Sequence, residues 1–289
     1  MTGSWEQPGK SPTAAAFVLV LICGSLYALA GSVVIAVVTV ATTLAGGRSA
    51  PAGLLAMLEA YYRRFQLVIL GVVTASQFLL FLALPLILFR RWHTHAVAAY
   101  FGYARPRAAD LALAALGAVA AVPVAGLLNS WVYFLFPVLR PLSRVGALLL
   151  ATPTPGYLAA VVLAVGVTPA ICEEALFRGY FQRTLQRAWS PTAAVLVSGT
   201  VFALFHQSPF SLFALVLVGC YLGFVYERSG SLYVPMTAHA VYNLAVIAAV
   251  NGAVPAFALE GEDFSWPVVA VAAAVLAAVT WVMTRRGRA

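Results

Sequence analysis

The amino-acid sequence predicts an all-α protein, a polytopic bundle of about eight transmembrane helices. The chain has 289 residues but only 17 basic and 9 acidic ones, and these make up 9% of it, whereas a soluble domain carries roughly a quarter. Hydrophobic residues make up 63% of the chain and the mean hydropathy is +0.94, which is more apolar surface than a water-soluble fold of this size can bury. The expected solvent is therefore lipid, and soluble, disordered, collagen-like and coiled-coil classes are excluded.

Eight apolar runs are long enough, or nearly so, to cross about 30 Å of hydrocarbon at 1.5 Å per residue. They cover 13–44, 66–89, 110–136, 156–187, 191–206, 209–227, 234–251 and 267–284. Serine followed by proline at Ser11, Ser190 and Ser208 is typical of a helix start, because the hydroxyl caps a free amide and proline fits the first turn. The first run is longer than a signal-peptide h-region, so we expect it to remain as an anchor. We predict one membrane domain, residues 1–289, whose chemistry lies in 155–250.

Basic residues are distributed unevenly between the predicted loops. With the N-terminus inside, twelve fall on the cytoplasmic side and five on the other, where the last loop carries Glu260, Glu262 and Asp263. Because cytoplasmic loops are enriched in Lys and Arg, we expect both termini in the cytoplasm. The net charge of +8 indicates attraction to anionic lipid in the bilayer rather than to nucleic acid. The excess of Arg over Lys suits a GC-rich genome and favours a bacterial plasma membrane.

Two adjacent carboxylates fall well inside a predicted span, where an ionised group costs on the order of 3 kcal/mol. Glu174 lies one helical turn before Arg178, and the two can pair on one face. Glu173 points about 100° away and has no partner in its own helix. We therefore interpret Glu174 and Arg178 as a structural ion pair and Glu173 as a functional carboxylate.

His206 and His239 also lie within predicted spans. Glu173 comes about 16 residues before a predicted hairpin near Ser190 and His206 comes about 16 after it, so antiparallel helices place both at the same depth. His239 and Asn243 are one turn apart and share a helix face. His93 and His95, in contrast, follow the second span next to two arginines and a tryptophan, where an interfacial belt is more plausible than a metal site.

Several helix irregularities are expected around these residues. Pro169 and Pro235 each stand four residues before a key polar residue, and a bend at both would open a polar chamber. Straight-helix arithmetic through the sixth run leaves His239 roughly 15 Å from the depth of His206. Tilt, a re-entrant start, or breaks near Pro209, Gly219 and Gly223 would close this gap.

A carboxylate, two histidines and an amide from three helices are suited to peptide hydrolysis. A carboxylate assisted by histidine can deprotonate water, and neutral or cationic donors can stabilise the oxyanion. We expect no cofactor for this chemistry. A catalytic zinc held by Glu173, His206 and His239 stays open as an alternative, because a His-His-Glu set suits zinc with a free fourth position.

The three motifs resemble those of the CPBP superfamily of intramembrane proteases, which includes type II CAAX prenyl endopeptidases and abortive-infection proteins. The family pattern is Glu-Glu-x-x-x-Arg, Phe-x-x-x-His and His-x-x-x-Asn, found here as Glu173, Glu174 and Arg178, then Phe202 and His206, then His239 and Asn243. The resemblance covers about residues 155–250. It implies a helical intramembrane endopeptidase in which Glu173 and His206 activate water, His239 and Asn243 bind the oxyanion, and Glu174, Arg178 and Phe202 support the site. Older family names call such enzymes metalloproteases.

A site formed by three lipid-embedded helices is reached most easily by a chain already held at the bilayer, so we expect a membrane-associated peptide or protein as substrate. Two other classes of function stay open on the sequence. Buried Glu and His are also used by proton-coupled transporters, although the chain shows no internal repeat. A non-catalytic immunity or scaffold protein could use the same helices.

Overall fold

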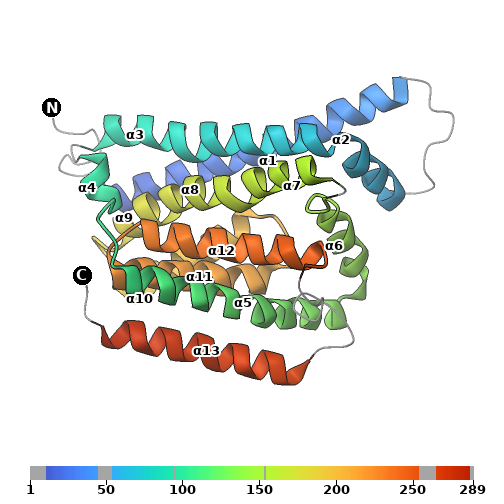
Figure 1. The fold of residues 1–289 in the computed structure, drawn as a ribbon. Helices are drawn as coiled ribbons and strands as arrows, with labels where there is room; N and C mark the ends of the chain where they lie inside the picture. Colours follow the sequence, from blue (N-terminus) through green and yellow to red (C-terminus); the bar gives the residue numbers. More distant parts are fainter. Residues whose placement is uncertain (1–10, 45–53, 94–95, 153, 254–264, 287–289) are drawn as a thin grey trace.

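The computed structural model describes residues 11–44, 54–93, 96–152, 154–253 and 265–286 (Figure 1). These residues form helices and no strand. Seven helical segments are long and apolar enough to cross a membrane: Pro12–Val33, Leu55–Trp92, Ala108–Leu135, Pro155–Leu185, Leu212–Ser229, Tyr233–Val250 and Trp266–Arg285. The prediction of a polytopic helical bundle is therefore confirmed, and the protein is an integral membrane protein.

The predicted span at 191–206 corresponds to α10 (Pro191–Phe205), which is shorter than the seven helical segments above. Its start agrees with the sequence, because the Ser190 hydroxyl accepts a hydrogen bond from the Ala193 amide at 3.2 Å. Its 15 residues extend only about 22 Å, which is less than the hydrocarbon thickness. The residue at its C-terminal cap is His206.

The chain turns back after α10 before the next helix, α11 (Leu212–Ser229), begins. Gln207 has a φ of 50°, and the Ser211 amide donates to the Ser208 carbonyl at 3.2 Å. Pro209 therefore lies in a turn. The helix is capped by Ser211, so the start predicted at Ser208 and Pro209 was wrong by three residues. Helix α11 is continuous through Gly219 and Gly223, so of the three predicted break positions only Pro209 lies outside a helix.

Two of the spans are assembled from α-helical and π-helical segments. The first of these spans consists of α2 (Leu54–Ser76), the π-helix η1 (Gln77–Ala83) and α3 (Leu84–Trp92). The other consists of α7 (Pro155–Val161), the π-helix η3 (Val162–Val167), α8 (Thr168–Glu174), the π-helix η4 (Ala175–Gln182) and α9 (Arg183–Leu185). π-Helical turns are wider than α-helical ones and are frequent at functional sites. Here η3 and η4 flank the helix that carries both glutamates.

The remaining elements complete the bundle around this composite helix. They are α1 (Pro12–Leu44), α4 (Val97–Phe101), α5 (Ala108–Leu135), the 3₁₀-helix η2 (Pro137–Leu139), α6 (Arg140–Ala147), α12 (Tyr233–Val250) and α13 (Trp266–Arg285). In Figure 1 the long helices run roughly alongside one another, with α8 and α12 towards the middle and α13 on the outside against α5. The composite α7–α9 helix therefore lies inside the bundle.

Helices α10 and α11 pack backbone to backbone at a pair of glycines. A Cβ added to Gly199 would lie 2.6 Å from the Cys220 amide nitrogen, and one added to Gly219 would lie 2.6 Å from the Gly199 carbonyl oxygen. Small residues allow this close approach between membrane helices. The contact fixes α10, and with it His206, against α11.

The two prolines singled out in the sequence act differently from one another. Pro235 is the third residue of α12, where its missing N–H would have no helical partner, so the predicted bend there was wrong. Pro169 lies inside the composite helix, directly after η3 and near the start of α8. It cannot donate to the carbonyl four residues earlier, that of Val165, and Asn243 Nδ2 donates to this oxygen at 2.9 Å.

Both described ends of the chain lie at the same end of the bundle (Figure 1). Arg228 at the end of α11 donates to the carbonyls of Met283 and Thr284 near the end of α13. Arg178 was wrongly counted among the twelve cytoplasmic basic residues, because it is fully buried in the protein and does not lie in a loop. The acidic loop at 260–263 and several of the counted cations lie outside the described residues, so the orientation stays a prediction.

Candidate active site

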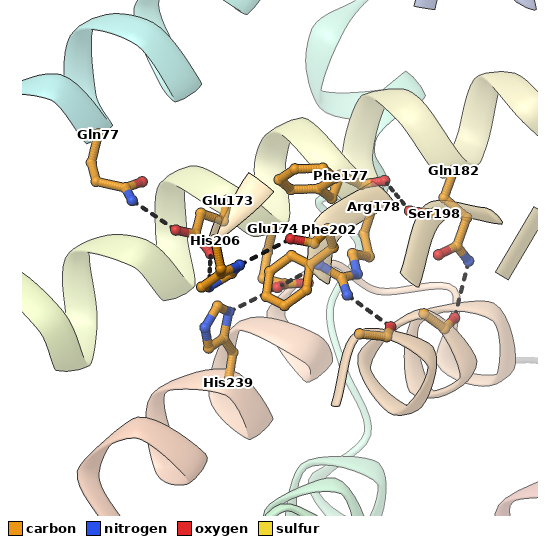
Figure 2. A network of polar contacts seen from close by, with 12 residues as sticks. Gln77, Glu173, Glu174, Phe177, Arg178, Gln182, Ser198, Phe202, His206 and His239 are labelled. Carbon is orange, nitrogen blue, oxygen red and sulfur yellow. Dashed lines mark hydrogen bonds and ion pairs between the residues drawn. The ribbon is translucent and has the colours of Figure 1, made fainter. Parts of the chain in front are cut away.

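The Glu173 carboxylate lies at the centre of a buried polar network (Figure 2). Its Oε1 accepts a hydrogen bond from Gln77 Nε2 at 2.7 Å. Its Oε2 lies 4.0 Å from His206 Nε2 and has no hydrogen-bond partner among the described residues. One oxygen of the carboxylate is thus held in place, and the other is available for chemistry.

The His206 ring is oriented by its own helix. Its Nδ1 lies 2.9 Å from the Phe202 carbonyl oxygen, one turn earlier in α10. A carbonyl oxygen only accepts hydrogen bonds, so Nδ1 carries the hydrogen and Nε2 faces Glu173. The 4.0 Å between Nε2 and Oε2 is too long for a direct hydrogen bond. The predicted meeting of Glu173 and His206 across the hairpin agrees with this geometry.

The second glutamate, Glu174, contacts both Arg178 on its own helix and His239 on α12. Glu174 Oε1 accepts from Arg178 Nη1 at 3.0 Å and lies 2.8 Å from His239 Nδ1. Glu174 and Arg178 are fully buried and His239 is nearly so. The predicted Glu174–Arg178 pair is present, but the sequence did not show that the same oxygen also holds His239. Glu174 therefore supports both a cation and a histidine.

The Phe202 ring packs against His206, His239 and Arg178. Its ring centroid lies 4.7 Å from that of His206 and 5.7 Å from that of His239, and the Arg178 guanidinium carbon lies 4.6 Å from it. Phe177 meets the same ring edge-on at 5.3 Å. The rings of both histidines therefore contact the same buried aromatic side chain.

The polar side chains of the composite helix are also tied to the neighbouring helices. Arg178 Nη2 donates to the Gly219 carbonyl at 2.8 Å, and Gln182 Nε2 donates to the Gly223 carbonyl at 3.0 Å. Ser198 Oγ on α10 donates to the Phe177 carbonyl at 3.1 Å. Figure 2 shows these bonds extending along the helix from the two glutamates. They hold η4 in register with α10 and α11.

Asn243 is placed one turn beyond His239 on α12, but it bonds to a different group. Its Nδ2 donates to the Val165 carbonyl in η3, and one of its two amide hydrogens is used there. The structure gives it no hydrogen bond to Glu173, His206 or His239. Its role as an oxyanion donor stays a prediction and would depend on the second hydrogen.

The hydrogen bonds of the site do not decide the zinc alternative. His239 turns its Nδ1 to Glu174 and Gln77 holds one oxygen of Glu173, and metal-binding histidines and carboxylates are commonly held in the same way. Across the described ranges, no three His, Cys, Asp or Glu side chains group as a metal site would require. His93 is buried against Phe89 and lies 3.3 Å from the Tyr180 hydroxyl, so it is a core residue, contrary to the interfacial position expected. His95 lies outside the described residues.

The hydrogen bond between Gln77 and Glu173 was not predicted from the sequence. It lies 96 residues before Glu173 in the chain, and a neutral amide in an apolar run carries no charge to attract notice. The one available signal was that a buried amide in a membrane span needs a hydrogen-bond partner.

Residues 155–245 match the family described as type II CAAX prenyl endopeptidase Rce1-like. No curated protein and no solved structure matches the chain. The matched segment runs from α7 into α12 and contains all three motifs, which confirms the resemblance to the CPBP superfamily. Gln77 lies outside it.

Proposed function

We propose that this integral membrane protein, whose residues 155–245 match the Rce1-like family, is an intramembrane endopeptidase that hydrolyses peptide bonds in membrane-associated substrates. The observation that carries the proposal is the buried pair of Glu173 and His206. One Glu173 oxygen is fixed by Gln77. The other has no hydrogen-bond partner within the described part of the chain and faces a histidine nitrogen at 4.0 Å.

The proposed reaction uses water as the nucleophile. A water placed between Glu173 Oε2 and His206 Nε2 can donate one hydrogen to each. Glu173 takes a proton as the oxygen attacks the substrate carbonyl, and a tetrahedral oxyanion forms. When the C–N bond breaks, the protonated carboxyl group returns the proton to the leaving amine. The products are a new amine and a new carboxylic acid, which loses its remaining proton to solvent to become a carboxylate, and Glu173 is ionised again.

The proposed oxyanion donor is His239. Glu174 is acceptor-only when ionised, so His239 Nδ1 must carry the hydrogen between them. For the same ring to donate to the oxyanion, its Nε2 must carry a hydrogen as well, so the proposed donor is an imidazolium. Asn243 is proposed as a second donor through the amide hydrogen that does not bond to Val165. No step requires a metal or another cofactor.

The substrate class follows from where the residues lie. Glu173 is 6% exposed and His239 is 3% exposed, whereas the His206 side chain is 31% exposed. His206 is therefore the accessible side of the site, and it caps a helix too short to cross the bilayer. A peptide already held at the membrane would reach this depth more easily than a soluble protein. We further propose a bacterial plasma membrane with both termini in the cytoplasm.

The test is cleavage by the purified full chain in bilayers. A library of peptides carrying a lipid or transmembrane anchor is compared with the same peptides without the anchor, and Glu173→Gln is the inactive control. Glu173-dependent cleavage of anchored peptides is expected. Equal cleavage of unanchored peptides would reject the substrate class. Proton flux that depends on Glu173 without cleavage would favour a transporter, and neither activity would favour a scaffold protein.

A further inference from the structure

We propose that Gln77 is a positioning residue that holds the Glu173 carboxylate in its reactive orientation, an inference that rests on the proposed function. Gln77 comes from the second span, about 80 residues before the family-matched segment. The site would therefore be completed by a part of the chain that carries none of the three motifs.

The contact is short, buried and directional. Gln77 Nε2 donates to Glu173 Oε1 at 2.7 Å, and the Gln77 residue is 2% exposed. Glu173 has no other hydrogen bond among the described residues, because its Oε2 is unpartnered. Without the amide, the carboxylate could rotate away from His206. With it, Oε2 stays 4.0 Å from His206 Nε2.

Gln77 is itself held by the packing of its helix. It is the first residue of η1, which packs against α8. Phe81 in the same π-helix lies against Tyr27 of α1 and Phe205 of α10, with ring centroids 5.0 and 6.1 Å apart. The Gln77 Oε1 has no partner among the described residues, so the hydrogen bond to Glu173 is the polar contact that orients the amide. A buried amide donor without a hydrogen-bond partner would destabilise the fold.

The chemistry suits a positioning role rather than proton transfer. A primary amide donates a hydrogen bond to an ionised carboxylate but does not exchange a proton with it at neutral pH. The charged or titratable groups near Glu173 are its chain neighbours Cys172 and Glu174, Arg178 on the same composite helix, His206 from α10 and Tyr27 of α1. Gln77 is the neutral donor among them, and it acts on the carboxylate without adding charge.

The test compares two buried glutamines of the same span. Gln77→Leu removes the amide beside Glu173, and Gln77→Met is a second variant of closer shape in case the first fails to fold. Gln66→Leu is the matched control. Gln66 is 5% exposed and donates to the carbonyls of Leu148, Leu149 and Ala151, away from the site.

Three readouts are taken on full-length protein in bilayers: kcat and KM on an anchored peptide, thermal unfolding, and the infrared carboxylate band of Glu173. The band is isolated by subtracting the spectrum of Glu173→Gln. For Gln77→Leu and Gln77→Met we expect kcat to fall about 10- to 100-fold with KM within about twofold, as for a misplaced reacting group, and the band to shift. Gln66→Leu should lower stability but leave kcat and the band unchanged.

The outcomes separate this inference from the proposed function. If the wild type cleaves and the Gln77 variants match Gln66→Leu in kcat, the positioning role is overturned although the function stands. If the band does not shift, the contact itself is wrong. If the wild type cleaves nothing while the band shifts, the proposed function fails, and the catalytic meaning of the contact fails with it.

Discussion

Glu174→Gln should destabilise the protein far more than the same change at its neighbour. Glu174 Oε1 is bonded to Arg178 and to His239, and both charged side chains of the ion pair are fully buried. Glutamine keeps the shape but leaves the Arg178 cation without a counter-charge. Removing one partner of a buried pair costs about 3–5 kcal/mol. For a chain of this length we expect the melting temperature to fall by about 10 °C.

Glu173→Gln is the matched control for this prediction. Its amide oxygen can still accept from Gln77, and Glu173 belongs to no ion pair shorter than 4.0 Å. We expect its melting temperature to stay within about 2 °C of the wild type, because no cation is left unpaired. Unfolding can be followed with a thiol-reactive dye, since Cys23 and Cys172 are buried in the folded protein.

A compensating variant makes the reasoning stricter. Combining Glu174→Gln with Arg178→Met removes the unpaired cation and fills its place with an apolar chain, so part of the lost stability should return. Catalysis should stay low in both, because His239 has lost its carboxylate partner. A loss of stability in Glu174→Gln no larger than in Glu173→Gln would refute the buried-pair argument.

Three further predictions follow from the packing, the site and the charge distribution. Gly219→Ala should cost about 1–3 kcal/mol by overpacking against Gly199. Gly71→Ala, where nothing lies within 4 Å of the added Cβ, should be neutral or stabilising by up to about 1 kcal/mol; equal melting temperatures for the two variants would contradict the glycine contact. Exhaustive chelation should leave the cleavage rate unchanged, and metal analysis should find no stoichiometric zinc. If zinc is bound stoichiometrically, and if its removal abolishes activity and its return restores it, then Glu173, His206 and His239 would be metal ligands. A reporter fused after Ala289 should be cytoplasmic, and an external reporter would reverse the topology.

Sequence reasoning succeeded where local spacing determines geometry. Apolar length gave the helices, i,i+4 spacing gave the Glu174–Arg178 pair, and equal distances from the turn near Ser190 predicted the approach of Glu173 to His206. Each depends on one helix or one hairpin, whose rise and period are fixed.

It failed where the answer depends on how distant helices pack. The roughly 15 Å difference in depth predicted between His206 and His239 came from straight-helix arithmetic through the sixth run, whereas Phe202 contacts both histidine rings in the structure. The contacts of Gln77 with Glu173 and of His239 with Glu174 join helices 96 and 65 residues apart in the chain. The π-helical turns of η1, η3 and η4 also rotate side chains away from ideal α-helical positions, and no residue pattern announced them.

The most direct test of the central claim is mass spectrometry of an anchored peptide incubated with the wild type and with Glu173→Gln in the same bilayers. We predict that the wild type produces two fragments that sum to the substrate plus one water. Glu173→Gln should be folded, with a rate lower by at least about 100-fold, the scale expected for loss of a general base. Cleavage by Glu173→Gln within about threefold of the wild-type rate would contradict the claim that Glu173 activates the water.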